Sequence, residues 1–131
     1  MQRINTAVIG VGRLGSAHAR IYNELSSSNL IGVCDTEKSR ALSIAESLHT
    51  KAFFNYKELL DKVQAVSIAT PTKGHYKIAK EFLQAGVNVL VEKPFTTTLG
   101  QADTLLKIAK EKNSIIQVGH IERFNSAFRA I

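Results

Sequence analysis

The chain has 131 residues, enough to bury the core of one domain, and its 44% hydrophobic and 21% charged residues are typical of a globular protein. Its net charge of +6 at pH 7 does not predict a nucleic-acid partner, because the lysines and arginines are scattered and form no cluster with interleaved aromatic residues. No apolar run nears the roughly 18 residues of a membrane span, no leader pattern is visible and one cysteine allows no internal disulfide, so we expect a cytoplasmic protein without a membrane partner.

Short apolar runs alternate with segments of helical periodicity along the sequence. Expected strands are residues 4–9, 30–34, 52–54, 65–69, 87–91 and 115–118, and expected helices are residues 13–26, 37–48, 56–62, 75–85 and 99–112. Strands that are nearly continuous apolar runs are typical of a parallel sheet covered on both faces. The pattern therefore predicts an α/β fold, a Rossmann-type doubly wound parallel sheet of six strands with right-handed crossovers and helices on both faces.

Apolar residues at helical spacing predict which face of a helix packs on the sheet. The predicted inward residues are Leu14, Ala17, Ile21 and Leu25 in residues 13–26, and Ala41, Leu42, Ile44, Ala45 and Leu48 in residues 37–48. Residues 120–131 begin an amphipathic segment with little remaining sequence to pack against. We therefore expect residues 1–119 to form the domain and residues 120–131 to start a connection to another one; a small protein ending in a helix is the alternative.

A glycine-rich turn follows the first expected strand, and its sequence is Gly10-Val11-Gly12-Arg13-Leu14-Gly15. The pattern G-x-G-x-x-G is weak alone, but between a strand and a helix it is the arrangement that a pyrophosphate site requires. Gly10 would allow the tight turn, Gly12 the close approach of the backbone to the pyrophosphate, and Gly15 the packing of helix on strand. The N–H groups at the helix start would then face the anion.

An acid, Asp35, closes the second expected strand about 20 residues after the glycines, where a carboxylate binds the adenosine ribose. Because a carboxylate accepts from both ribose hydroxyls and repels a 2′-phosphate, Asp35 favours NAD over NADP. Lys38 and Arg40 could instead turn toward a 2′-phosphate, although the solvent face of the next helix is the favoured place for them. The alternative role for Asp35 is the N-cap of that helix.

The turn Ala69-Thr70-Pro71 follows the fourth expected strand, and ligands in such sheets lie beyond the carboxyl ends of the strands. Its backbone is expected to line the cofactor ribose, although a sharp strand exit is a sufficient structural role. His75, just beyond, is a candidate ligand contact or a surface histidine at the start of a helix.

Glu92-Lys93-Pro94 follows the fifth expected strand. A turn fixed by the proline would aim Lys93 into the cleft, where its ammonium could hydrogen-bond a substrate hydroxyl and stabilise the alkoxide formed as hydride leaves. Partial desolvation would lower the pKa of Lys93 toward the range of acid–base catalysis. A charge pair on the surface is the alternative interpretation.

Together these features resemble the glucose–fructose oxidoreductase / inositol dehydrogenase / MocA family, across essentially the whole chain. The matching segments are Gly10-Val11-Gly12-Arg13-Leu14-Gly15, Asp35, Ala69-Thr70-Pro71, Glu92-Lys93-Pro94 and Gly119-His120-Ile121-Glu122-Arg123-Phe124-Asn125. The resemblance implies that Lys93 touches both the substrate and the nicotinamide ribose as the catalytic lysine. It also implies that Glu92 and Thr70-Pro71 line the cofactor, and that Arg123 lies near its nicotinamide end.

Members of the family look like two-domain NAD(P)-dependent enzymes that oxidise or reduce a hydroxyl of a sugar or an inositol. The final motif looks most like members acting on nucleotide-linked sugars, such as UDP-N-acetylglucosamine 3-dehydrogenases, although Ser126 stands where members often have proline. The resemblance implies a second α/β domain with the substrate pocket, a catalytic histidine and a homo-oligomer interface. We therefore expect residues 1–119 to be a dinucleotide-binding domain that binds NAD, holds no metal and turns over little alone.

Two other functions fit the same residues less well. A non-catalytic module that senses NAD(H) or a nucleotide would need the glycine turn and Asp35, but it would not need Lys93 beside the cleft. If the chain were a structural or partner-binding domain, the two independent features that indicate cofactor binding would both have arisen by chance.

Overall fold

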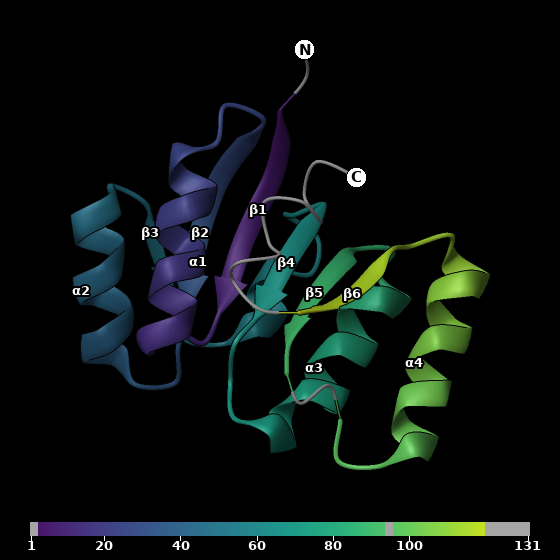
Figure 1. Ribbon diagram of the computed structural model, residues 1–131. Helices are drawn as coiled ribbons and strands as arrows, with labels where there is room; N and C mark the ends of the chain where they lie inside the picture. Colours follow the sequence, from purple (N-terminus) through teal and green to yellow (C-terminus); the bar gives the residue numbers. More distant parts are fainter. Residues whose placement is uncertain (1–2, 94–95, 120–131) are drawn as a thin grey trace.

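The computed structural model describes residues 3–93 and 96–119, and everything below concerns these residues (Figure 1). The strands are β1 (Ile4–Ile9), β2 (Ser28–Cys34), β3 (Lys51–Phe53), β4 (Ala65–Ile68), β5 (Asn88–Glu92) and β6 (Ile116–Gly119). The helices are α1 (Arg13–Glu24), α2 (Lys38–Leu48), the 3-10 helix η1 (Tyr56–Leu59), α3 (Thr72–Gln84) and α4 (Leu99–Lys112). The predicted order of elements is confirmed.

The strands form one parallel sheet in the order β3-β2-β1-β4-β5-β6. The chain runs outward from β1 to β3 and then returns to the middle to continue from β4 to β6. The order reverses between β1 and β4, so the carboxyl ends of these two strands flank the position where such sheets bind ligands. The predicted doubly wound fold is confirmed.

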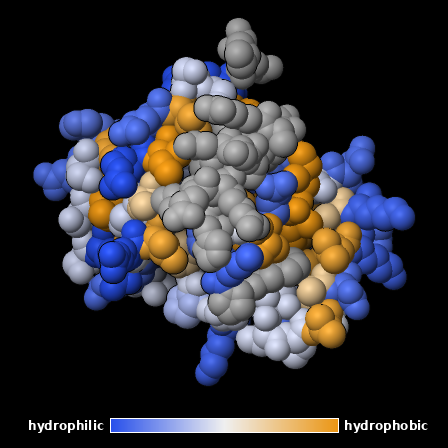
Figure 2. Space-filling view, in the orientation of Figure 1, coloured by the Kyte–Doolittle hydropathy of each residue, from blue (hydrophilic) through white to orange (hydrophobic). Residues whose placement is uncertain are grey.

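Alternate residues of each strand face opposite sides of the sheet, and each side has its own apolar cluster. Val66 and Ile68 of β4 pack in the cluster that includes Phe82 and Leu105, from α3 and α4. Val8 and Val33, from β1 and β2, lie in a second cluster beneath α1 and α2, which also includes Tyr22, Ala45 and four further buried or partly buried side chains of those helices. The hydrophilic residues lie at the margins of the molecule, over α2 on one side and α4 on the other (Figure 2).

The predicted inward face of α1 is only partly confirmed: Ile21 and Leu25 pack against the second cluster, but Leu14 does not face the sheet. Leu14 is 49% exposed, and the buried residues of α1 are Gly15, His18, Ala19 and Tyr22. The reason is the contact at Gly15, where a Cβ would lie 1.7 Å from the carbonyl oxygen of Gly10. Since only a glycine permits this approach, the face that carries Gly15 turns to the sheet and rotates Leu14 outward. Leu42 of α2, also predicted inward, is 54% exposed.

Several boundaries differ from prediction, and the two largest differences are at helices. Residues 56–62, expected as a helix, form only the short 3-10 helix η1, whose N-cap Asn55 accepts a hydrogen bond from the Lys57 N–H. Helix α3 begins at Thr72, three residues before the expected start. Pro71 stands at its N-cap with φ −55°, close to the helical value, so the helix can begin directly after it.

Candidate functional site

The glycine turn is held by close backbone contacts at its two ends. The Gly10 N–H donates to the Cys34 carbonyl at 2.7 Å, and Gly10 has φ +89°, which favours glycine. A Cβ on Gly10 would lie 2.8 Å from the Thr70 nitrogen. The turn is therefore clamped between the end of β2 and the loop after β4, and Gly10 and Gly15 are both required by packing.

Gly12 differs from the other two glycines, because a Cβ there would meet no protein atom within 4 Å. It stands at the N-cap of α1, where it provides no side-chain cap, and the first turn of α1 contains no acid. Gly12 lines the cleft described below. Backbone N–H groups at an open helix start are an anion site, and a side chain on Gly12 would fill the space before them. The residues present therefore fit a pyrophosphate.

Asp35 is 9% exposed, and each of its carboxylate oxygens accepts a hydrogen bond from a backbone N–H group. Its Oδ2 accepts from the Val11 N–H at 3.0 Å, inside the glycine turn, and its Oδ1 accepts from the Glu37 N–H at 2.9 Å. The N-cap residue of α2 is Glu37, so the alternative that Asp35 caps the helix is wrong. The carboxylate fixes the loop between β2 and α2 while it lines the cleft.

Arg40 lies beside this carboxylate and also lines the cleft. Its guanidinium is 3.4 Å from Asp35 Oδ2 and 2.8 Å from a Glu37 carboxylate oxygen. Arg40 is exposed, as expected for the solvent face of α2, but its guanidinium also lies beside the Asp35 carboxylate. Lys38 is exposed as well, and its ammonium lies 5.4 Å from the centre of the Phe54 ring.

A cleft of about 850 Å³ opens at the carboxyl edge of the sheet. Its walls come from the glycine turn, the end of β2, the loop after β3 and the loop after β4. Predicted residues that line it are Gly10, Gly12, Arg13, Leu14, Asp35, Ala69, Thr70 and Pro71. Leu14, exposed by the rotation of α1, is thus on the wall of the cleft. Val11 is buried behind the wall at 1% exposure, with its N–H on Asp35.

The segment after β3, which was not predicted as part of the site, contributes Phe54, Asn55 and Tyr56, the first residue of η1, to the cleft. Strand β3 pairs with β2 in parallel, so its carboxyl end meets the same edge of the sheet as Asp35. The sequence predicted a parallel sheet, whose strands all end at one edge, but Phe54, Asn55 and Tyr56 match no motif that would have singled them out. Cys34 lines the floor, and burial raises the pKa of its thiol to about 12, as expected of a small buried hydrophobe.

His75 supports the loop after β4 from below. It is 1% exposed, so the alternative of a surface histidine is wrong, and its Nε2 lies 2.7 Å from the Thr70 carbonyl oxygen. It is not among the residues that line the cleft. The Thr70 hydroxyl oxygen is buried without a hydrogen-bond partner among residues 3–93 and 96–119, which makes it a candidate donor to a bound ligand.

Glu92 and Lys93 are not among the residues that line the cleft. Glu92 is 5% exposed, and its Oε1 is 2.6 Å from the Nε2 of His18, a residue that the sequence analysis did not single out. Lys93 is exposed, so the described residues do not provide the desolvation expected of it. Pro94 and Arg123 lie outside the described residues.

Residues 3–93 and 96–119 contain neither a metal cluster nor a membrane-spanning helix. No three His, Cys, Asp or Glu side chains gather there into a group that could hold a metal ion. None of the helices there has the length and apolar character needed to cross a membrane.

Comparison with known families decides what this sheet and cleft belong to. Residues 4–120 match the family model described as "Oxidoreductase family, NAD-binding Rossmann fold", GFO_IDH_MocA. The chain belongs to the Gfo/Idh/MocA family. The match places the chain in the NAD-binding domain of this oxidoreductase family, which confirms the expected cofactor and fold.

Similar Gfo/Idh/MocA proteins act on sugars and inositols, according to their names. The chain is 43% identical over 129 residues to the UDP-N-acetylglucosamine 3-dehydrogenase of Acidithiobacillus ferrooxidans, covering 98% of this chain and 41% of that protein. It is 33% identical to the scyllo-inositol 2-dehydrogenase (NAD(+)) of Bacillus subtilis, covering 96% and 38%. The chain thus spans about two fifths of the length of these relatives.

Solved Gfo/Idh/MocA structures have the same domain. The structure of the Acidithiobacillus ferrooxidans enzyme superimposes with a TM-score of 0.87 and 44% identity, over 94% of this chain and 40% of that one. GenD2 from gentamicin A biosynthesis, solved in complex with NAD, gives a TM-score of 0.88 and 31% identity, over 91% and 35%.

Proposed function

We propose that this chain is the cofactor half of an NAD-dependent oxidoreductase that transfers a hydride between the nicotinamide and a hydroxyl of a sugar, nucleotide sugar or cyclitol. The observation that carries the proposal is Lys93, an exposed lysine that follows a buried glutamate at the carboxyl end of β5. Strand β5 pairs with β4, whose own end leads into the cleft wall at Ala69. A lysine so placed can reach a substrate held against the cofactor.

In this proposal the open start of α1 binds the pyrophosphate through backbone N–H groups, with Gly12 leaving the space for it. Asp35 accepts from the adenosine ribose hydroxyls with the lone pairs that Val11 and Glu37 leave available. The loop at Thr70 and Pro71, held by His75, lines the cofactor on the other side of the turn. Arg123 is assigned to the nicotinamide end by the family resemblance alone, and Pro94 is expected to fix the turn that carries Lys93.

NAD, when bound, supplies the acceptor for a hydride, which leaves the substrate carbon with the electron pair of the C–H bond. Lys93 would hydrogen-bond the substrate oxygen and stabilise the negative charge that develops on it. The proton of the hydroxyl would pass to a base in the second domain, whose presence the family resemblance implies. Lys93 is therefore proposed as one half of the catalytic site, and the chain alone is expected to bind NAD with little or no turnover.

The whole protein is proposed to act on a nucleotide sugar in the cytoplasm, as a homo-oligomer. The support for the substrate is the 43% identity to a relative named for UDP-N-acetylglucosamine, against 33% to one named for scyllo-inositol. Since both compounds carry secondary hydroxyls, the chemistry at Lys93 would be the same for either.

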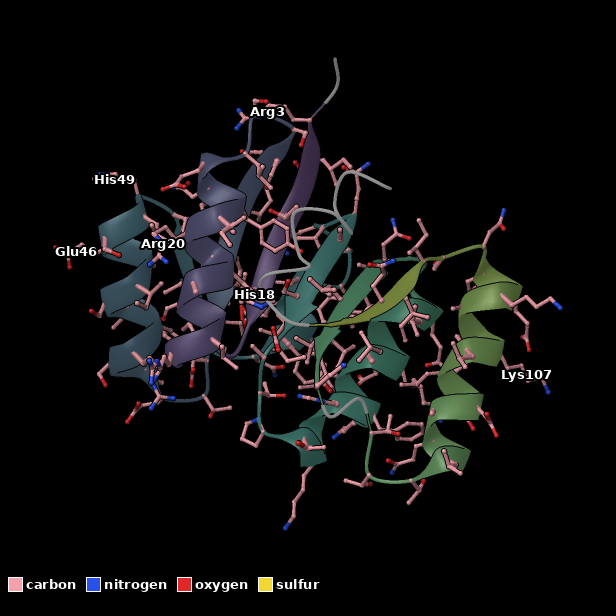
Figure 3. All side chains as sticks on the ribbon, viewed as in Figure 1. Arg3, His18, Arg20, Glu46, His49 and Lys107 are labelled. Atoms are coloured by element: carbon pink, nitrogen blue, oxygen red, sulfur yellow. The ribbon has the colours of Figure 1, made fainter. Side chains whose placement is uncertain are left out.

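The test is turnover of the full-length protein, followed as NADH absorbance with nucleotide sugars, free sugars and inositols. Lys93→Met should abolish turnover while NAD still binds, and Lys107→Met, at an exposed lysine of α4 far from the cleft, should not change it (Figure 3). Equal turnover in the Lys93 variant and the wild type would contradict the catalytic role. NAD binding without turnover of any substrate would favour the sensing module instead.

A further inference from the structure

Four polar side chains meet beneath the turn that carries Lys93. Glu92 Oε1 lies 2.6 Å from His18 Nε2, His18 Nδ1 lies 2.9 Å from Ser67 Oγ, and Ser67 Oγ lies 3.0 Å from the Tyr22 hydroxyl. Their exposures are 5%, 0%, 0% and 2% in the same order. Figure 3 shows His18 pointing from α1 toward the strands in the middle of the sheet. We call these four residues the His18 network.

Stability alone does not account for the buried polar side chains of the His18 network. Ser67 stands between Val66 and Ile68, so a branched apolar residue would suit its strand equally well. A buried ion pair or polar pair is often no more stable than packed hydrophobic residues of similar volume. Burial lowers the pKa of His18, against the opposing effects of the Glu92 hydrogen bond and charge. With a neutral imidazole and a Glu92 carboxylate, the His18 Nε2–H donates to Glu92.

The position of the network connects the two parts of the proposed site. His18 comes one helical turn after Gly15, on the helix that begins at the glycine turn, and Glu92 is the residue before Lys93. Helix α1 and strand β5 belong to opposite halves of the sheet, and Ser67 is on β4, next to the switch point. The hydrogen bond between His18 and Glu92 is thus a direct side-chain link from the helix at the pyrophosphate position to the catalytic turn.

We propose that His18 is a positioning residue for Lys93, because its imidazole fixes the Glu92 carboxylate and thereby the backbone from which the lysine projects. This inference rests on the proposed catalytic role of Lys93. Misplacing a reacting group by about 1 Å can cost on the order of 100-fold in rate. Loss of His18 should therefore lower kcat and leave the binding of NAD, which the glycine turn and Asp35 perform, nearly unchanged.

The experiment compares three variants of the full-length protein with the wild type and Lys93→Met. His18→Leu removes both hydrogen bonds, and we expect kcat to fall by 10- to 100-fold while KM for NAD changes less than twofold. His18→Gln keeps an amide donor that can reach Glu92, and it should recover most of the loss. Tyr22→Phe removes only the distant hydroxyl of the network, and its kcat should stay within twofold of the wild type.

Each outcome separates this inference from the function on which it rests. Wild-type kcat in a folded His18→Leu protein, with turnover abolished in Lys93→Met, would overturn the positioning role alone. A loss in Tyr22→Phe equal to that in His18→Leu would also overturn it, because the network would then be merely structural. If His18→Leu does not fold, the glutamine variant decides, and a kcat as low as that of Lys93→Met would count against the proposal. No turnover in the wild type would overturn both proposals.

Discussion

The cofactor cleft and the Lys93 turn lie at the same edge of the sheet, but they are built in opposite ways. In the cleft, the glycine turn and the Asp35 carboxylate are each fixed by other parts of the same chain: the Gly10 N–H donates to Cys34, and Asp35 accepts from the Val11 and Glu37 N–H groups. At the turn, Glu92 is buried and anchored by His18, whereas Lys93 directly after it is exposed.

This difference indicates what each region can do alone. The cleft has a floor and walls within the described residues, so we expect it to bind NAD without help from another domain. The turn has an anchor beneath it, but Lys93 is exposed among the residues that the structure describes. In its proposed catalytic role, Lys93 needs a substrate held against it, so this turn requires a further surface. We therefore expect substitutions in the two regions to affect NAD binding, folding and turnover separately.

The largest expected loss of stability is at Gly15, which we compare with Gly12 of the same turn. A Cβ at Gly15 would lie 1.7 Å from the Gly10 carbonyl oxygen, so Gly15→Ala must displace α1 from the sheet. We expect a loss of at least about 4 kcal/mol of unfolding free energy, measured by urea denaturation. NAD binding should disappear with it.

Gly12→Ala is the matched control for Gly15→Ala, because its Cβ would meet no protein atom within 4 Å. Alanine at an N-cap costs about 1 kcal/mol or less relative to glycine, so the fold should remain. NAD affinity, measured by calorimetry, should nevertheless fall, since the methyl group occupies the space before the helix start. Equal stability of the two variants would show that the close contact at Gly15 can relax.

The next largest effect concerns two adjacent residues, Glu92 and Lys93. Glu92→Leu removes the partner of a buried histidine, and breaking a buried pair from one side costs about 3 kcal/mol or more. Lys93→Leu changes an exposed side chain and should alter the unfolding free energy by less than about 0.5 kcal/mol. Thermal and urea unfolding of the two variants would test this contrast. Similar losses in both would mean that Lys93 has a structural role.

The fold and the cleft could largely be predicted from the sequence, and the reasons are physical. Continuous apolar strands alternating with helical segments permit few arrangements other than a doubly wound parallel sheet. The carboxyl ends of its strands then share one edge, which brings together the glycine turn, Asp35 and the loop at Thr70. Those residues were found because each is local to the end of a strand.

His18 could not be predicted in the same way. Its partner Glu92 is 74 residues away in sequence, and its contact depends on which face α1 turns to the sheet. Apolar periodicity alone placed Leu14 on that face, because it gave no weight to the close packing that Gly15 allows. The histidine one turn later therefore had no visible partner. The backbone contact at Gly15 decides the rotation of α1, and the spacing of apolar residues does not reveal that contact.

A smaller effect is expected at Asp35, where binding and loop structure are combined in one carboxylate. Asp35→Asn keeps the shape and one oxygen acceptor but removes the charge, and a hydrogen bond to a charged group contributes about 1.5–3 kcal/mol. We expect NAD affinity to fall by about tenfold or more and the preference over NADP to narrow, because Arg40 loses its nearest cleft-side carboxylate. Calorimetry with both cofactors would measure this.

Glu37→Gln is the control for Asp35→Asn. Glu37 also pairs with Arg40, at 2.8 Å, but it does not line the cleft. Its variant should leave both affinities within twofold of the wild type. If instead it changes the preference between NAD and NADP as much as Asp35→Asn does, the position of Arg40 would control selectivity, and the ribose role of Asp35 would not be supported.

The smallest expected effect is a pH dependence of stability that comes from the His18 network. Burial lowers the pKa of His18 below its ordinary value of 6.5, so the unfolded chain binds a proton at His18 more readily than the folded chain does. The contribution of His18 to the unfolding free energy is therefore complete above pH 6.5 and is lost as the pH falls from there toward the pKa of the folded state. The unfolding free energy should change with a slope of at most about 1.4 kcal/mol per pH unit. Urea midpoints between pH 7.5 and 5 should fall more steeply for the wild type than for His18→Gln, because glutamine does not titrate. Parallel curves for the two proteins would mean that His18 has the same pKa in both states, and that the Glu92 carboxylate offsets the cost of its burial.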